Sequence, residues 1–152
     1  MRARKYCNST TARKKANQNY ISLKIGNVSV DILIDSGSSR SLISENTAKA
    51  LKLKIDPLST SDHPSLFAAN SSRLRIIGST VVSVFLKGLT IYQTVYVATQ
   101  LNPEILFGGD FLSENAAVIN YRLGILSLHG FWRCFQSLRN WGREPPNQFR
   151  GC

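Results

Sequence analysis

Short segments in which apolar and polar residues alternate, separated by turns that contain glycine or asparagine, recur from Tyr20 to Leu128. Alternation with a period of two is typical of strands, and only two segments have the composition of short helices. The pattern predicts an all-β fold of the barrel or sandwich type. We expect strands over residues 20–25, 28–34, 41–43, 66–68, 74–78, 80–86, 91–97, 105–108, 117–120 and 125–128, and helices over residues 45–55 and 110–115.

The turn Asp35-Ser36-Gly37 directly follows the apolar run of residues 32–34. Aspartate, serine and glycine are ordinary turn residues, so this tripeptide alone indicates only a turn. Its place at the end of a buried strand adds more. The glycine permits a close approach of other backbone or substrate, and the Ser36 hydroxyl can brace the turn from within. The segment therefore predicts an aspartate that is held rigidly at the floor of a cleft.

A second motif, which combines apolar residues with glycine, lies far downstream: Glu104-Ile105-Leu106-Phe107-Gly108-Gly109-Asp110-Phe111-Leu112. Strand-rich sequence that includes residues 68–72 and 76–78 separates the two motifs. In this order the motifs resemble those of the retropepsin-like aspartic proteases, and above all the protease domains of LTR retrotransposon polyproteins. In that family D-[ST]-G-[AS]-x-x-S precedes a flap hairpin, and a hydrophobic triplet with glycine then precedes x-D-F-L. The resemblance extends over residues 20–128, and three motifs in order are far more specific than one.

The resemblance implies a retropepsin-like acid-protease β-barrel with two short helices that is active as a homodimer. It implies an aspartic endopeptidase that processes a retrotransposon polyprotein, with Asp35 as the catalytic residue. Ser36 would interlock the two catalytic loops, and Gly37 would offer backbone contacts to an extended peptide. The hairpin at residues 69–72 would form the flap. The residues that the resemblance places against substrate are Leu33, Ser38, Ala69, Asn70, Ser71 and Leu106.

Hydrolysis of a peptide by carboxylates needs two of them, one on each side of a water molecule. Two adjacent carboxylates resist being ionised together, and this separates their roles as base and acid; the aspartic-protease dyad is the established example. The sequence contains one Asp-Ser-Gly, and neither Asp31 nor Asp110 stands in a second such motif. We therefore infer that the second carboxylate is Asp35 of an identical chain, because a two-fold axis brings the same patch of both copies together.

The chain departs at two positions from the retroviral proteases that it resembles. Those proteases often carry an acid two residues after the motif glycine and an arginine after the glycine of the second motif. Ser39 and Gly109 occupy these positions here, so both members of the pair are absent together. The expected flap tip at residues 70–72 also lacks the glycine that is common there. For closure of the dimer, the resemblance suggests the strand at residues 125–128.

Basic residues are concentrated at the two ends of the chain. Of the formal net charge of +10, +6 lies in residues 1–18 and +3 in residues 130–152, which leaves +1 for residues 19–129. We interpret residues 1–18 as a disordered basic segment, residues 19–129 as the protease domain and residues 130–152 as a basic, aromatic tail. Both tails are typical of linkers in a longer polyprotein, and nonspecific contact with nucleic acid is the alternative.

Composition argues against several other functions. The three cysteines are scattered and show no metal-ligand spacing, and the two histidines have no partner cluster, so we expect neither a disulfide framework nor a metal or cofactor site. No apolar stretch is long enough to cross a bilayer, and the N-terminus has no hydrophobic run typical of a secretory signal. We therefore expect an intracellular, cytoplasmic protein without membrane contact.

Two other functions remain open at this point. The chain is either an active protease or a domesticated, inactive copy that keeps the fold as a dimerisation or peptide-binding module. The intact Asp35-Ser36-Gly37 favours the enzyme, because folding alone does not require a carboxylate at that turn. A nucleic-acid-binding module that depends on the tails is the third hypothesis. It predicts binding that weakens steeply with salt.

Overall fold

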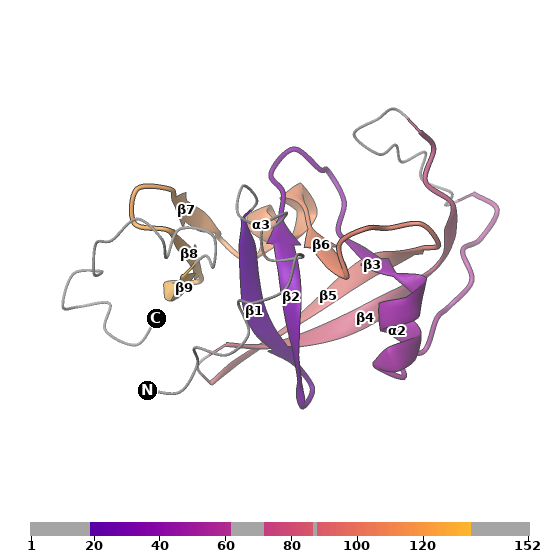
Figure 1. The fold of residues 1–152 in the computed structure, drawn as a ribbon, viewed down its shortest axis with the longest axis horizontal. Coiled ribbons are helices and arrows are strands. Elements are labelled where there is room, and N and C mark those ends of the chain that lie inside the picture. Colours follow the sequence, from indigo (N-terminus) through magenta and orange to yellow (C-terminus); the bar gives the residue numbers. More distant parts are fainter. Residues whose placement is uncertain (1–18, 62–71, 87, 135–152) are drawn as a thin grey trace, which may run out of the picture.

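The computed structural model describes residues 19–61, 72–86 and 88–134. Six strands close into a barrel in the order β1-β2-β6-β3-β5-β4, and three further strands form a small sheet in the order β7-β8-β9 (Figure 1). The predicted mostly-β fold with two short helices is confirmed for this part of the chain. The elements are β1 (Tyr20–Ile25), β2 (Val28–Ile34), β3 (Leu42–Ser44), α2 (Glu45–Ala50), β4 (Ile76–Leu86), β5 (Leu89–Ala98), β6 (Ile105–Phe107), α3 (Gly109–Glu114), β7 (Val118–Asn120), β8 (Ile125–Leu128) and β9 (Phe131–Cys134).

Strands β1 and β2 form the antiparallel hairpin that leads to Asp35, with the bounds that the sequence predicts. Gly26 in the turn has a φ of 59°, a left-handed conformation that glycine adopts without strain. Alternate residues of β2 are buried in the barrel, so Ile32 and Ile34 fix which face of the strand points inward. Residues 33 and 35 consequently belong to the opposite face.

The core fills the barrel with aliphatic side chains and two phenylalanines. Phe107 at the end of β6 stacks on Phe111 of α3, with 3.9 Å between the ring centroids. Both side chains are fully buried, as is Ile105. Burial of large apolar side chains is the main stabilising contribution to such a fold. The stacked pair fixes α3 next to the end of β6.

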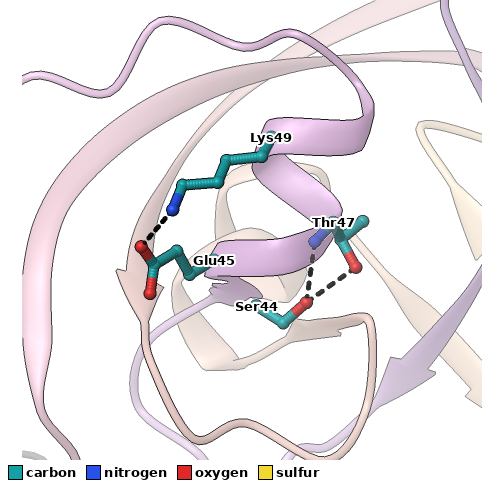
Figure 2. A network of polar contacts seen from close by, with 4 residues as sticks. All are labelled: Ser44, Glu45, Thr47 and Lys49. Carbon is teal, nitrogen blue, oxygen red and sulfur yellow. Dashed lines mark hydrogen bonds and ion pairs between the residues drawn. The ribbon is translucent and has the colours of Figure 1, made fainter.

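Helix α2 begins at the serine cap that the sequence predicts. The Ser44 hydroxyl accepts a hydrogen bond from the Thr47 backbone N–H at 3.1 Å, and Glu45 pairs with Lys49 one turn later (Figure 2). The predicted end of the helix near residue 55 is wrong, because α2 ends at Ala50. Lys52 has a left-handed φ of 55°, which stops the helix well before Pro57.

Strand β4 is continuous where the sequence suggested two strands that meet near Gly78. Asp56 forms a bridge with Ser79, and a Cβ atom on Gly78 would lie 2.6 Å from the Asp56 carbonyl oxygen. The glycine therefore allows another backbone segment to cross β4 and does not mark a strand end. The register against β5 shifts between Ile76 and Gly78. The strand predicted over residues 66–68 lies outside the described residues.

In the small sheet, β8 lies between β7 and β9 and pairs with both. The predicted pair of strands around Gly124 is confirmed, and β9 adds a third strand within residues 130–152, the segment interpreted as a tail. Because both edges of β8 are occupied within the chain, residues 125–128 have no free edge for a strand of a second copy. Among the described residues, no helix is long and apolar enough to span a membrane.

Candidate active site

Asp35 lies directly after β2, where the parallel pairing of β2 with β6 continues for one more residue. The Asp35 backbone N–H donates to the Phe107 carbonyl at 3.0 Å, and its own carbonyl accepts from the Ser38 N–H at 3.1 Å. The Asp35 side chain is half-buried, and its Oδ1 accepts a hydrogen bond from the Gly37 N–H at 2.9 Å. The aspartate is therefore held by the sheet behind it and by the turn in front.

The Asp35-Ser36-Gly37 turn is braced differently from the sequence-based expectation. The Ser36 side chain is exposed and makes no hydrogen bond within the described part of the chain, so its expected bracing role inside the turn is wrong. The Gly37 N–H holds the carboxylate instead. A Cβ atom on Gly37 would lie 3.2 Å from the Asp35 Oδ1, closer than most such contacts, so a side chain at position 37 would crowd the carboxylate. The proposed role of Ser36 between two copies stays a prediction.

The chain after the turn packs on the two glycines that follow β6. The Gly109 N–H donates to the Ser38 carbonyl at 2.7 Å, and the Ser38 hydroxyl donates to the Arg40 carbonyl at 2.8 Å. A Cβ atom on Gly108 would lie 2.6 Å from the Ser38 carbonyl oxygen and 2.7 Å from that of Arg40. Glycine at position 108 is thus required for the loop that carries Asp35 to lie across the end of β6.

Asp110 and Ser41 join the two motifs through their side chains. Asp110 Oδ2 accepts from the Ser41 N–H at 3.0 Å, and Oδ1 accepts from the Ser41 hydroxyl at 2.6 Å and from the Phe111 N–H at 2.7 Å. The buried Ser41 hydroxyl in turn accepts from the Gly108 N–H at 3.0 Å. The Asp110 carboxylate is committed to three donors, so it does not act as a second catalytic carboxylate beside Asp35. It positions the Asp35 loop.

Sequence reasoning did not assign this Asp110–Ser41 clamp, although both residues stand in the quoted motifs. Ser41 is the final serine of the first motif, and Asp110 is the aspartate of the second. The sequence signal for this contact is a hydroxyl residue in the first motif and a carboxylate residue in the second, 69 residues apart.

We expect Asp110→Asn to lower the free energy of unfolding by about 2 kcal/mol and to reduce the activity of the site. In either orientation of the asparagine, its NH2 group faces the N–H of Ser41 or that of Phe111, so two donors meet and one hydrogen bond is lost. Urea denaturation measures the stability. Asp56→Asn is the matched control, because the Asp56 carboxylate is largely exposed beside Lys54 and should contribute less than about 0.5 kcal/mol. Equal stabilities of the two variants would contradict the clamp.

The predicted substrate-contacting residues divide into two groups. Leu33 is paired with Leu106 across β2 and β6, and Leu106 is paired with Leu42 across β6 and β3, so the three side chains form a row on the face that also carries Asp35. Leu33 is half-buried and Leu106 is 8% exposed. Ser38 is half-buried, and its hydroxyl donates to the Arg40 carbonyl. Ala69, Asn70 and Ser71, the expected flap residues, lie outside the described residues.

Asp31 and His129, two other ionisable residues that the sequence analysis considered, have hydrogen-bond partners. Asp31 on β2 accepts a hydrogen bond from the Ser22 hydroxyl at 2.6 Å. His129 faces Asn115, with 3.1 Å between its Nε2 and the amide oxygen. Within the described residues, no three histidine, cysteine or acidic side chains form a group that could hold a metal ion. The chemistry that these residues offer is that of one rigid carboxylate at the edge of an apolar row.

The comparisons with known proteins agree with this geometry. A family profile described as "gag-polyprotein putative aspartyl protease" matches residues 21–114, which contain both motifs. No match was found among the curated proteins.

Two solved structures share the fold at low sequence identity. The retroviral protease-like domain of Ddi1 from Leishmania major aligns with a TM-score of 0.63 at 21% identity, over 78% of this chain and 93% of that domain. The EIAV protease, solved in complex with the inhibitor HBY-793, aligns with a TM-score of 0.55 at 19% identity, over 68% of this chain and 93% of that protease.

Proposed function

The chain belongs to the family of retropepsin-like aspartic proteases of the gag-polyprotein type. We propose that it hydrolyses peptide bonds as a homodimer. The observation that carries the proposal is the difference in hydrogen bonding between the two aspartates near the end of β6. Asp35 has one oxygen held by the Gly37 N–H, whereas Asp110 is saturated by hydrogen bonds within its own chain. One chain therefore offers one carboxylate for chemistry, and a two-fold axis through the Asp35 loops provides the second.

In the proposed mechanism a water molecule lies between Asp35 and the partner's Asp35, which share one proton. The ionised carboxylate removes a proton from the water as the oxygen attacks the peptide carbonyl. The protonated carboxyl donates its proton to the carbonyl oxygen, which gives a tetrahedral gem-diol. The C–N bond then breaks as the carboxyl that took the water proton passes it to the leaving nitrogen, and the other carboxylate takes a proton back from a gem-diol hydroxyl, so the pair again holds one proton.

The substrate in this proposal is an extended segment of a polyprotein. Leu33 is half-buried and keeps surface on the face that carries Asp35, whereas Leu106 and Leu42 beside it are 8% and 4% exposed. An extended peptide next to Asp35 would therefore pack an apolar side chain against Leu33. The family name supports a polyprotein as substrate, with processing of a retrotransposon polyprotein as the specific role. Nonspecific nucleic-acid contact through residues 1–18 and 130–152 stays a prediction, since residues 1–18 and 135–152 lie outside the described residues.

The test is incubation of the purified chain with a diverse peptide mixture across about pH 4 to 7, with sedimentation in the same buffers. We expect cleavage that appears at the protein concentrations at which the dimer forms. A stable dimer that cuts no peptide at any pH would contradict the proposal and favour the inactive dimerisation or peptide-binding module.

A further inference from the structure

Arg40 lies between the Asp35 turn and β3, two residues before Leu42 of the leucine row. The side chain of the neighbouring Ser41 is buried and donates to Asp110. The backbone carbonyl of Ser41 accepts the Tyr96 N–H at 3.0 Å, so the pairing of β3 with β5 extends by one residue. The chain bends at Arg40, and β3 begins two residues later at Leu42. The Arg40 side chain is exposed.

The backbone of Arg40 is fixed at a defined place relative to Asp35. The Arg40 carbonyl accepts a hydrogen bond from the Ser38 hydroxyl at 2.8 Å and packs against Gly108. The Asp35 N–H donates to the carbonyl of Phe107, the residue before Gly108. Asp35 and Arg40 thus lie on either side of the end of β6. Two strand spacings place their backbones about 10 Å apart, which corresponds to roughly three residues of an extended peptide.

The positive charge of Arg40 has no partner in the described part of the chain. Its guanidinium makes no ion pair or hydrogen bond there, and the residues between it and Asp35 are uncharged. The nearest acid of the second motif, Asp110, is occupied by Ser41 and Phe111. A guanidinium in this situation is suited to bind a carboxylate through two parallel hydrogen bonds.

We propose that Arg40 determines specificity by binding an aspartate or glutamate side chain of the substrate, two or three residues from the scissile bond. This inference rests on the proposed protease function. In a two-fold dimer each copy presents one Arg40, so the preference for an acidic residue should occur on both sides of the scissile bond.

The test is a series of peptides that share one cleavage site and carry glutamate, glutamine or lysine in turn at each position within four residues of it. We expect kcat/KM to favour glutamate over glutamine by about tenfold at one position on each side, for a charge-assisted contact. With Arg40→Gln the ratio should fall to about 1, and with Arg40→Glu it should favour lysine. Lys24→Gln, which removes the same charge at the far end of the β1–β2 hairpin, should keep the ratio of the unmodified protein.

A second measurement separates this proposal from the proposed function. Fluorescent versions of the same peptides are titrated against Asp35→Asn protein, which is expected to bind without cutting. Stronger binding of the glutamate peptides that is lost with Arg40→Gln supports the inference even if the unmodified protein proves inactive. Cleavage or binding whose charge preference is unchanged by Arg40→Glu would overturn the role of Arg40 and leave the protease function standing. Absence of both cleavage and binding would overturn both proposals.

Discussion

Replacement of Asp35 by asparagine is expected to reduce peptide cleavage at least about a thousandfold, equivalent to about 4 kcal/mol in the activation barrier. An amide can neither take a proton from water nor share one with a partner carboxylate. The asparagine oxygen can still accept the Gly37 N–H, which Asp35 binds at 2.9 Å, so the fold should keep its stability. Cleavage of a peptide substrate and thermal unfolding of the same preparation measure the two effects.

Asp31→Asn is the matched control for this substitution. Asp31 lies on the same strand and accepts the Ser22 hydroxyl, so its replacement should leave cleavage within about threefold of the unmodified protein and slightly lower its stability. Cleavage that survives in Asp35→Asn, or that is lost equally in Asp31→Asn, would show that another group performs the chemistry.

Gly108→Ala is expected to lower the free energy of unfolding by about 3 kcal/mol or more and to abolish cleavage. The new methyl group would lie 2.6 Å from the Ser38 carbonyl oxygen and 2.7 Å from that of Arg40. Both are backbone atoms and cannot rotate away, so the whole Asp35 loop would have to move. Urea denaturation and peptide cleavage test the prediction.

The neighbouring Gly109→Ala separates this steric effect from the general effect of losing a glycine. A Cβ atom on Gly109 would meet only the Ser38 carbonyl oxygen at 3.5 Å, an ordinary contact, and alanine favours the first turn of α3. We expect its stability to change by less than about 1 kcal/mol. Similar losses in the two variants would contradict the close packing of the Asp35 loop on Gly108.

Much of the fold could be predicted from local patterns. Strands β1 and β2 match their expected bounds because apolar alternation and the Gly26 turn are both local signals. The Ser44 cap of α2 was predictable for the same reason. The local pattern wrongly predicts two strands that meet at Gly78, because the passage of Asp56 over that glycine is a tertiary contact with no local signature.

The candidate site could be predicted only in part. Asp35 was identifiable because it follows an apolar strand and stands in a family motif. The bracing of its turn by the Gly37 N–H, with Ser36 exposed, depends on backbone geometry that residue types alone do not define. The Asp110–Ser41 clamp connects residues that come together only when β6 lies between β2 and β3. The expected flap contacts and the paired carboxylates stay predictions.

The most direct test of the shared pair of carboxylates is to mix unmodified protein with Asp35→Asn protein. The unmodified protein is kept at a fixed concentration at which it is dimeric, and the variant is added in equal amount and then in ninefold excess, with time for exchange. If two copies form one site, random pairing predicts that cleavage falls to about one half and then to about one tenth. A rate that does not change as the variant is added would show that each chain cuts by itself and would contradict the account.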